Sequence, residues 1–137
     1  MGQPTCAAST LTVTDADTLV TPQYKHEVFV LRTSGPPCQL KGYPAVRLLD
    51  SAGHQLAVRT QAGGFGLPPR TPQTVTLSRS TSLSFEVATA RDGSCQEVAA
   101  ILATLPGTSG GHRAATSLRV CGATVGLSPV LRMSDAE

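Results

Sequence analysis

Apolar and polar residues alternate along much of this chain with a period of two. The clearest run covers residues 82–89, in which Leu83, Phe85 and Val87 are separated by smaller or polar residues. A period of two places neighbouring side chains on opposite faces of a β-strand, so this run predicts a strand with one buried face. Shorter runs of the same kind contain Leu11 and Val13, Val75 and Leu77, and Leu118 and Val120.

Two further segments, residues 27–31 and 45–49, are apolar on both faces at their centres. This pattern is typical of strands that lie inside a sheet, so both are predicted to be central. Residues 46–49 and 55–58 flank Asp50 and Gly53, residue types that favour a type I turn followed by a positive φ. The sequence therefore predicts a hairpin there.

Residues 94–103 allow two interpretations. Ser94 and Glu97 form a capping-box pattern before an Ala-rich run, which predicts a helix that ends before Pro106. The same apolar run between turn signals also fits a buried strand, and the surrounding composition favours the strand.

Seven to nine short strands separated by turns predict an all-β fold, a two-sheet antiparallel sandwich of immunoglobulin-like type. A chain of 137 residues provides material for one domain, which we place at residues 6–133. Residues 1–5 are expected to be a disordered N-terminal remnant, and residues 134–137 a disordered C-terminal tail.

The four cysteines, Cys6, Cys38, Cys95 and Cys121, have no close Cys or His neighbour. This spacing does not suit a metal site, and it predicts two disulfides in an exported protein. Four cysteines allow three pairings. We choose Cys6 with Cys38 and Cys95 with Cys121, because each pair brackets strand segments that are sequential and therefore usually adjacent.

Export requires a leader, yet the N-terminus has neither a charged nor an apolar leader region. We expect that a leader has been removed from the sequence and that Met1 is an added start. A lipid anchor on Cys6 is an alternative, but Pro4 and Thr5 are not the small and aliphatic residues that such processing requires. No stretch approaches the ~20 apolar residues of a membrane-spanning helix.

The charges argue against nucleic acid as a partner. The net charge of +2 arises from 11 basic and 9 acidic residues that are scattered singly along the chain. Such scatter predicts no basic patch. Two Tyr, three Phe and no Trp provide few platforms for stacking bases.

No catalytic or metal centre is predicted. His26, His54 and His112 are far apart and form no ligand motif. There is no Gly-x-Ser-x-Gly motif, and residues 109–112 lack the strand-turn-helix context of a nucleophile. Residues 63–66 lack the Gly-Lys-Ser/Thr ending of a phosphate loop. We therefore expect no cofactor.

One segment carries a resemblance to a known family. Cys38-Gln39-Leu40-Lys41-Gly42-Tyr43-Pro44 resembles the Cys-x-Leu-x-Gly-Tyr-Pro signature of domain of unknown function 4232, found in exported actinobacterial proteins and lipoproteins. The similarity continues through Val46, Asp50, Gly53, Cys95, Pro106 and Cys121. It implies an extracytoplasmic location, four paired cysteines and a β-sandwich, but no activity.

Tyr43 and Pro44 mark the start of a predicted strand. Pro cannot donate to a β-ladder, so Pro44 is expected at a strand start or a bulge, after a trans peptide bond. We expect the Tyr43 ring to pack against the end of the sandwich with its hydroxyl bonded to backbone.

Any binding surface is predicted on the loop of residues 59–72, because recognition often uses loops carried by a rigid sandwich. Phe65 lies among three glycines and either folds back as a plug or projects as an anchor, with Arg59 and Arg70 at the loop bases.

Together these features predict a monomeric, non-enzymatic, extracytoplasmic binding or interaction module of the cell envelope, either secreted or lipid-anchored. Its partner would be a protein or another envelope component. The alternatives are an envelope hydrolase whose site assembles only in three dimensions, and a passive structural module.

Overall fold

The computed structural model describes residues 4–133, and within them strands account for nearly all regular structure. A 3-10 helix, η1 (Ala8–Thr10), precedes the first strand. The strands are β1 (Leu11–Val20), β2 (Tyr24–Thr33), β3 (Cys38–Leu40), β4 (Ala45–Leu49), β5 (Arg59–Ala62), β6 (Val75–Leu77), β7 (Leu83–Thr104), β8 (His112–Leu127) and β9 (Leu131–Arg132). The predicted fold class, an all-β two-sheet immunoglobulin-like sandwich with two disulfides, is confirmed.

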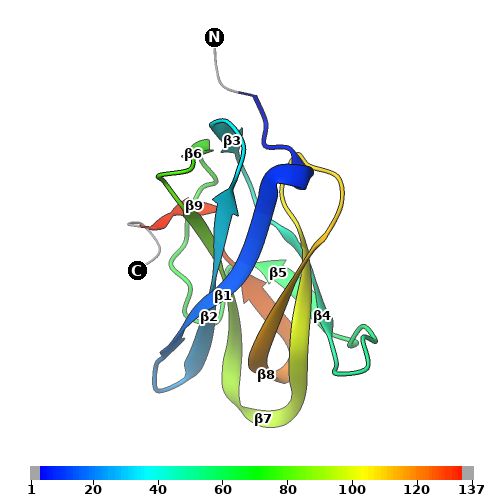
Figure 1. The fold of residues 1–137 in the computed structure, drawn as a ribbon. Coiled ribbons are helices and arrows are strands. Elements are labelled where there is room, and N and C mark those ends of the chain that lie inside the picture. The colour runs from blue at the N-terminus through cyan, green and yellow to red at the C-terminus, as the bar shows by residue number, and fades with distance from the viewer. Residues whose placement is uncertain (1–3, 134–137) are drawn as a thin grey trace.

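β7 and β8 form a long two-stranded ribbon that bends back on itself, as Figure 1 shows. The first half of β7 pairs with β2, and its second half pairs with β4. β8 follows β7 around the bend, where Ala90 and Cys95 both pair with Cys121. Gly93 (φ 119°) and Gly122 (φ 90°) lie at this bend, in backbone conformations that residues with a Cβ atom rarely adopt. Strand was therefore the correct interpretation of residues 94–103.

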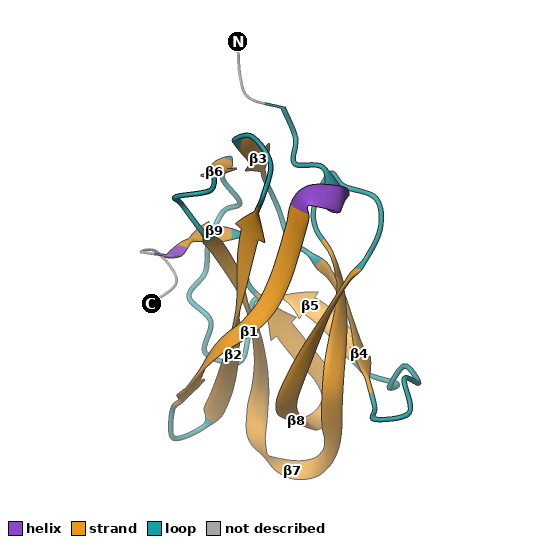
Figure 2. Cartoon of the chain, in the orientation of Figure 1, coloured by secondary structure: helices purple, strands orange, loops and turns teal. Residues whose placement is uncertain are grey.

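The bend places the two arms of the ribbon in different layers (Figure 2). Hydrogen bonds continue through it, so most strands belong to one sheet of order β1-β2-β7-β8-β5, to which β4 and β9 are joined through β7. β3 and β6 form a second, two-stranded sheet. Their pairing is antiparallel, whereas β5 runs parallel to β8.

The core lies between the layers and is built mainly from aliphatic side chains. At its centre the rings of Phe29 and Phe85 stack with centroids 5.4 Å apart. The other largest fully buried side chains are those of Leu31, Leu40, Leu48, Leu77, Leu83, Ile101, Leu105, Leu118, Val87 and Val98. Each sheet face that points inward thus follows the period-two pattern of the sequence.

Two expectations about strand environment were wrong. β4 is not central. One of its edges pairs with β7, and the segment that follows its turn pairs with it only through an isolated bridge between Leu49 and Gln55. The first half of β7 is buried on both faces, including Ser84 and Glu86. β9 and Ser128 pair along the edge of this half, and on its outer face the Glu86 side chain lies beside His26, which is bonded to the loop around Phe65.

The turn between residues 49 and 55 has the predicted chemistry. The Asp50 carboxylate accepts hydrogen bonds from the backbone N–H groups of Ala52 and His54, each at 2.9 Å. Gly53 has a φ of 84° and donates its N–H to the Asp50 carbonyl. The turn is thus held by the Asp side chain and by glycine, as expected for these residue types.

Pro44 directly precedes β4, and no peptide bond among residues 4–133 is cis, so both expectations for this proline are confirmed. The expected C-terminal tail, residues 134–137, lies outside the described residues, as do residues 1–3 of the expected N-terminal remnant. Pro4 and Thr5 are described: the Pro4 carbonyl accepts a hydrogen bond from Gln39, and Thr5 bridges Gln39.

Both predicted disulfide pairings are confirmed. Cys6 is bonded to Cys38, which fastens the N-terminal segment to β3. Cys95 is bonded to Cys121 across the bend of the β7–β8 ribbon. The two disulfides therefore secure opposite parts of the chain, and they indicate an oxidising, extracytoplasmic environment.

Candidate functional site

The glycine-rich loop around Phe65 folds back onto β2. Phe65 has a φ of 57°, and the three glycines that surround it also have positive φ. The Phe65 ring is half-buried and meets the edge of Tyr24, with centroids 6.1 Å apart and planes at 87°. A Cβ atom on Gly66 would lie 2.8 Å from the Tyr24 ring, so glycine permits this close approach. This is the geometry of a plug and not of a projecting anchor.

His26 contacts both the same loop and the buried Glu86 side chain. His26 Nε2 lies 2.7 Å from the Phe65 carbonyl oxygen, and since a carbonyl only accepts, Nε2 carries the proton. His26 Nδ1 lies 3.4 Å from Glu86 Oε1, and both side chains are buried. Burial raises the pKa of Glu86, an effect that the charges of His26 and Arg70 oppose.

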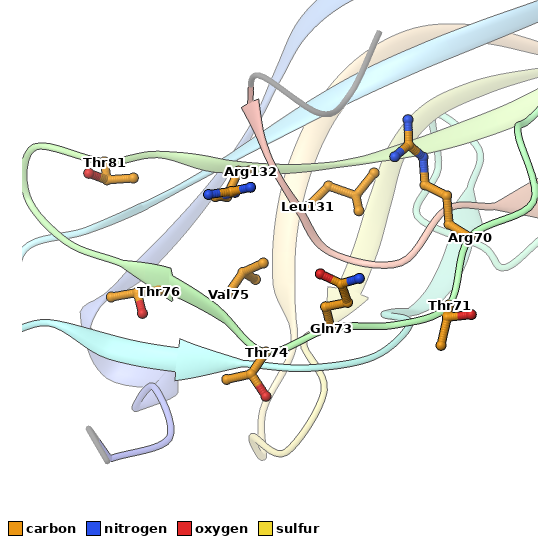
Figure 3. A pocket seen from close by; sticks show the side chains of 9 residues that line it. All are labelled: Arg70, Thr71, Gln73, Thr74, Val75, Thr76, Thr81, Leu131 and Arg132. Carbon is orange, nitrogen blue, oxygen red and sulfur yellow. The ribbon is translucent and has the colours of Figure 1, made fainter. Parts of the chain in front are cut away.

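A groove with a volume of about 710 Å³ lies beside β9. We call it the β9 groove. Its walls come from residues 70–76, Thr81 and β9, and its lining residues are Arg70, Thr71, Gln73, Thr74, Val75, Thr76, Thr81, Leu131 and Arg132. Figure 3 shows Arg70 and Gln73 projecting to the same side of their segment as Leu131, whereas Thr71 and Thr74 project to the other side.

A smaller hollow of about 310 Å³ shares Arg70 with the β9 groove. It lies against the glycine-rich loop and includes Tyr43, Leu67 and Ser128 in its lining. The Tyr43 hydroxyl donates a long hydrogen bond of 3.5 Å to the Arg70 carbonyl. This is the contact with the backbone that was expected for Tyr43. Arg70 therefore connects the loop to the groove.

The structure brings only part of the predicted binding surface together. Arg70 lies at the groove and Phe65 lies on the adjoining loop, which is one continuous segment of residues 63–76. Arg59 begins β5, is exposed and pairs with Thr124, so it lines neither hollow.

Two acidic side chains meet in a separate hollow between β1, β2 and β8. Thr18 donates a 2.7 Å hydrogen bond to Glu27, and Thr116 donates a 2.6 Å hydrogen bond to Asp15. Burial and the neighbouring Asp15 carboxyl raise the pKa of Glu27 to about 7. The Glu27 carboxyl is therefore partly protonated near neutral pH.

The remaining histidines do not form a centre. His54 lies on the exposed turn, with Nδ1 3.9 Å from Asp50 Oδ2. His112 begins β8, and its Nε2 atom is buried without a hydrogen-bond partner. Among residues 4–133 there is no group of three His, Cys, Asp or Glu side chains that could hold a metal ion.

These features define a class, a disulfide-bonded β-sandwich module with a polar surface groove beside β9. The chain matches the model of domain of unknown function DUF4232 over residues 6–132. It therefore belongs to the DUF4232 family. No curated protein and no solved structure matched the chain. Within the described range, no helix has the length and apolar character needed to cross a membrane.

Sequence reasoning missed the His26–Glu86 pair and most of the β9 groove. A signal was present for Glu86, which stands between the apolar residues Phe85 and Val87, but not for His26, which stands between Lys25 and Glu27. The groove had a weaker signal, the threonine-rich run of residues 71–76, and its far wall comes from β9, which is distant in sequence.

Proposed function

We propose that this domain is a non-enzymatic binding module of the cell envelope and that the β9 groove is its binding site. The location is supported by the two disulfides, which form and persist in oxidising compartments. Whether the native protein is secreted or lipid-anchored is part of the same proposal, since both would expose the domain to the envelope.

The observation that carries the binding role is the lining of the groove. Its volume of about 710 Å³ falls within the range of ligand sites, and its lining residues are mostly polar, with Val75 and Leu131 as the apolar ones. Both long walls are backbone segments attached to the sandwich, since residues 75–77 pair with β3 and β9 pairs with β7. A site on such segments is preformed, which lowers the entropic cost of binding.

The hydrolase alternative would use His26, whose Nδ1 atom faces a carboxyl group as in many catalytic dyads. Its other ring nitrogen donates to the Phe65 carbonyl, so it is not available to a nucleophile while the loop is in place. Binding is therefore the better-supported function.

The test is retention by isolated actinobacterial envelope fragments, measured by co-sedimentation of the oxidised domain. Gln73→Trp should fill the groove, since Gln73 is exposed and projects along it (Figure 3). Gln96→Trp is the matched control, since Gln96 is also exposed and lies on β7 outside the groove lining. We expect Gln73→Trp to weaken retention at least tenfold, about 1.4 kcal/mol, and Gln96→Trp to leave it unchanged.

Equal retention of the two variants would place the binding site elsewhere, and no retention of the unaltered domain would overturn the binding role. Release of soluble fragments from the envelope during incubation would instead indicate a hydrolase. Melting curves for both variants control for folding, because exposed substitutions usually change stability by less than about 0.5 kcal/mol.

A further inference from the structure

The His26 ring lies between two hydrogen-bond acceptors. Its Nε2 atom is 2.7 Å from the Phe65 carbonyl oxygen, and its Nδ1 atom is 3.4 Å from Glu86 Oε1. A backbone carbonyl only accepts, and so does an ionised carboxylate, whereas a neutral imidazole has a single ring hydrogen to donate. Both contacts are therefore satisfied together only when His26 and Glu86 share one further proton.

That shared proton has two positions that satisfy both contacts. In the first, His26 is an imidazolium and donates from both ring nitrogens. In the second, the protonated Glu86 carboxyl donates to Nδ1, while Nε2–H still donates to the Phe65 carbonyl. Burial raises the pKa of Glu86 and favours the second position, whereas the charge of His26 opposes this shift and favours the first. In either position the proton belongs to the pair.

Loss of the shared proton sets two acceptors against each other. If the remaining ring hydrogen points at Phe65, the Nδ1 lone pair faces the Glu86 carboxylate. If it points at Glu86, the Nε2 lone pair faces the Phe65 carbonyl. Because both side chains are buried, either mismatch is costly while the loop is closed. Opening the glycine-rich loop relieves it, since water can then reach both side chains.

The strands around His26 supply no second proton donor to its ring. The residues that pair with it are apolar, Leu19 on β1 and Ala88 on β7. Alternation along β2 places the side chains of Lys25 and Glu27 on the opposite face of the sheet.

Three other ionisable side chains come from the elements around this site. Arg70 acts on the Glu86 carboxyl and favours its ionised form. An arginine keeps its charge at every pH of interest, so it sets where the pair titrates but adds no titration of its own. Tyr24 contacts the Phe65 ring through its edge, and Asp17 on β1 is exposed, where solvent and salt screen its charge.

The loop itself has the means to open. Phe65 has a φ of 57°, which is costly for a residue with a Cβ atom, and the glycines on both sides of it accept other backbone conformations. The bond from His26 to its carbonyl and the contact of its ring with Tyr24 keep Phe65 in place. Weakening the first of these contacts therefore favours release of the loop.

We infer that the His26–Glu86 pair is a pH-dependent fastening of the glycine-rich loop, in which one shared proton keeps the loop closed and its loss on raising the pH releases the loop. In the open loop both side chains are solvated and lose their protons at ordinary values, so the closed state binds more protons toward high pH. Closure is thus strongest on the acidic side of neutral pH. This inference goes beyond the proposed binding role and does not depend on it.

Hydrogen exchange of the oxidised domain, followed by NMR, tests the fastening. The Gly63 and Leu67 N–H groups of the loop donate to carbonyls at 2.8 and 3.1 Å, and the Ser34 N–H donates to a carbonyl outside the loop at 3.0 Å. Dividing loop protection by Ser34 protection removes changes in global stability. We expect this ratio to fall about tenfold or more between about pH 6 and about pH 9.

Glu86→Gln should abolish that fall. The glutamine amide donates to Nδ1 at every pH, which leaves Nε2–H on the Phe65 carbonyl, so the loop stays closed. Glu27→Gln is the matched control, because it makes the same substitution at a buried carboxyl on the opposite face of β2. Its protection ratio should keep the full pH dependence of the unaltered domain.

A ratio that stays constant with pH in the unaltered domain would overturn the inference, whether or not either variant folds. The same fall in Glu86→Gln as in the unaltered domain, or loss of the fall in Glu27→Gln, would assign the titration to another group and would also overturn it. Ring ¹⁵N NMR of His26 needs no variant: its titration midpoint should coincide with the loss of loop protection, and clearly separate midpoints would contradict the fastening.

Discussion

At the scale of single residues, the buried Glu27 carboxyl is the most unusual group. It lies beside Asp15 on the paired strands β1 and β2, with Thr18 donating to it and Lys25 close enough to oppose the shift. The pKa of Glu27 is raised to about 7 from 4.5. In the unfolded chain the same carboxyl ionises near its ordinary value, so the folded state binds more protons between these two values.

Stability should therefore fall as the pH rises from about 5 to 7 and should level off above that range. Glu27→Gln replaces the carboxyl with a neutral group of the same shape. Relative to the unaltered domain, we expect the variant to gain on the order of 2–3 kcal/mol between pH 5 and pH 8. Urea unfolding at both values measures the gain.

Glu97→Gln is the control for this substitution, because the Glu97 side chain is 79% exposed. Its stability should follow that of the unaltered domain at both pH values. A Glu27→Gln variant with the same pH dependence as the unaltered domain would contradict the buried, protonated carboxyl.

A second residue-scale prediction concerns Tyr43, whose hydroxyl makes the backbone contact expected from the sequence. The distance to the Arg70 carbonyl is 3.5 Å, at the limit of a hydrogen bond. Tyr43→Phe should therefore cost about 0.5 kcal/mol or less, below the ~1 kcal/mol of a well-formed hydrogen bond. A thermal melt showing a loss well above 1 kcal/mol would require a stronger contact than this geometry provides.

At the scale of elements, the loop of residues 63–70 behaves as part of the sandwich because it covers the outer face of β2 and β7. Leu67 is buried in it, and the Phe65 carbonyl is bonded to His26. The local conformation could be predicted from its glycines, but its position could not. Periodicity identifies which residues form strands, whereas the covering of a second strand face depends on contacts distant in sequence.

Phe65→Ala tests how far this loop depends on its aromatic contact. A half-buried ring packed on Tyr24 should contribute about 1–2 kcal/mol, less than the ~3 kcal/mol or more of a fully buried Phe. Chemical denaturation measures the difference. A change below about 0.5 kcal/mol, combined with weaker envelope retention, would show that Phe65 acts as an anchor.

Gly66→Ala probes the backbone of the same loop. Gly66 has a φ of 83°, and an added Cβ would approach the Tyr24 ring to 2.8 Å. We expect a loss of at least 1 kcal/mol from the combined conformational and steric effects. Gly53→Ala is the informative comparison, since Gly53 has a φ of 84° but nothing within 4 Å, so it isolates the conformational cost. Equal losses in the two variants would show that the contact with Tyr24 adds nothing.

At the scale of the whole molecule, the class of fold and both disulfides followed from the sequence because strand periodicity and cysteine spacing are local properties. The misplacement of β4 and the missed β9 groove share one cause. Each depends on which strands become neighbours, and the bent β7–β8 ribbon decides this by presenting its two arms to different partners. The alternation of apolar and polar residues in 82–89 does not predict that bend.

The molecular surface also bears on association. Among residues 4–133, the large hydrophobic side chains that are exposed are Val20, the last residue of β1, and Met133, which follows β9. Stable dimers usually bury a contiguous apolar patch, so we expect the domain to sediment as a single chain at micromolar concentration. A concentration-dependent increase in the sedimentation coefficient would contradict this expectation.

The bent ribbon finally suggests the order in which the molecule folds. In the ribbon, the pair with the shortest sequence separation is Ala103 with His112, nine residues apart, and the separation increases gradually to the pair of Val87 with Leu127. The pairing of β2 with β7 joins residues that are farther apart in sequence, such as Tyr24 and Ala90. Closing short loops first costs less chain entropy. The ribbon should thus zip from its closed end, and φ-value analysis should give higher values for Val98→Ala than for Val28→Ala.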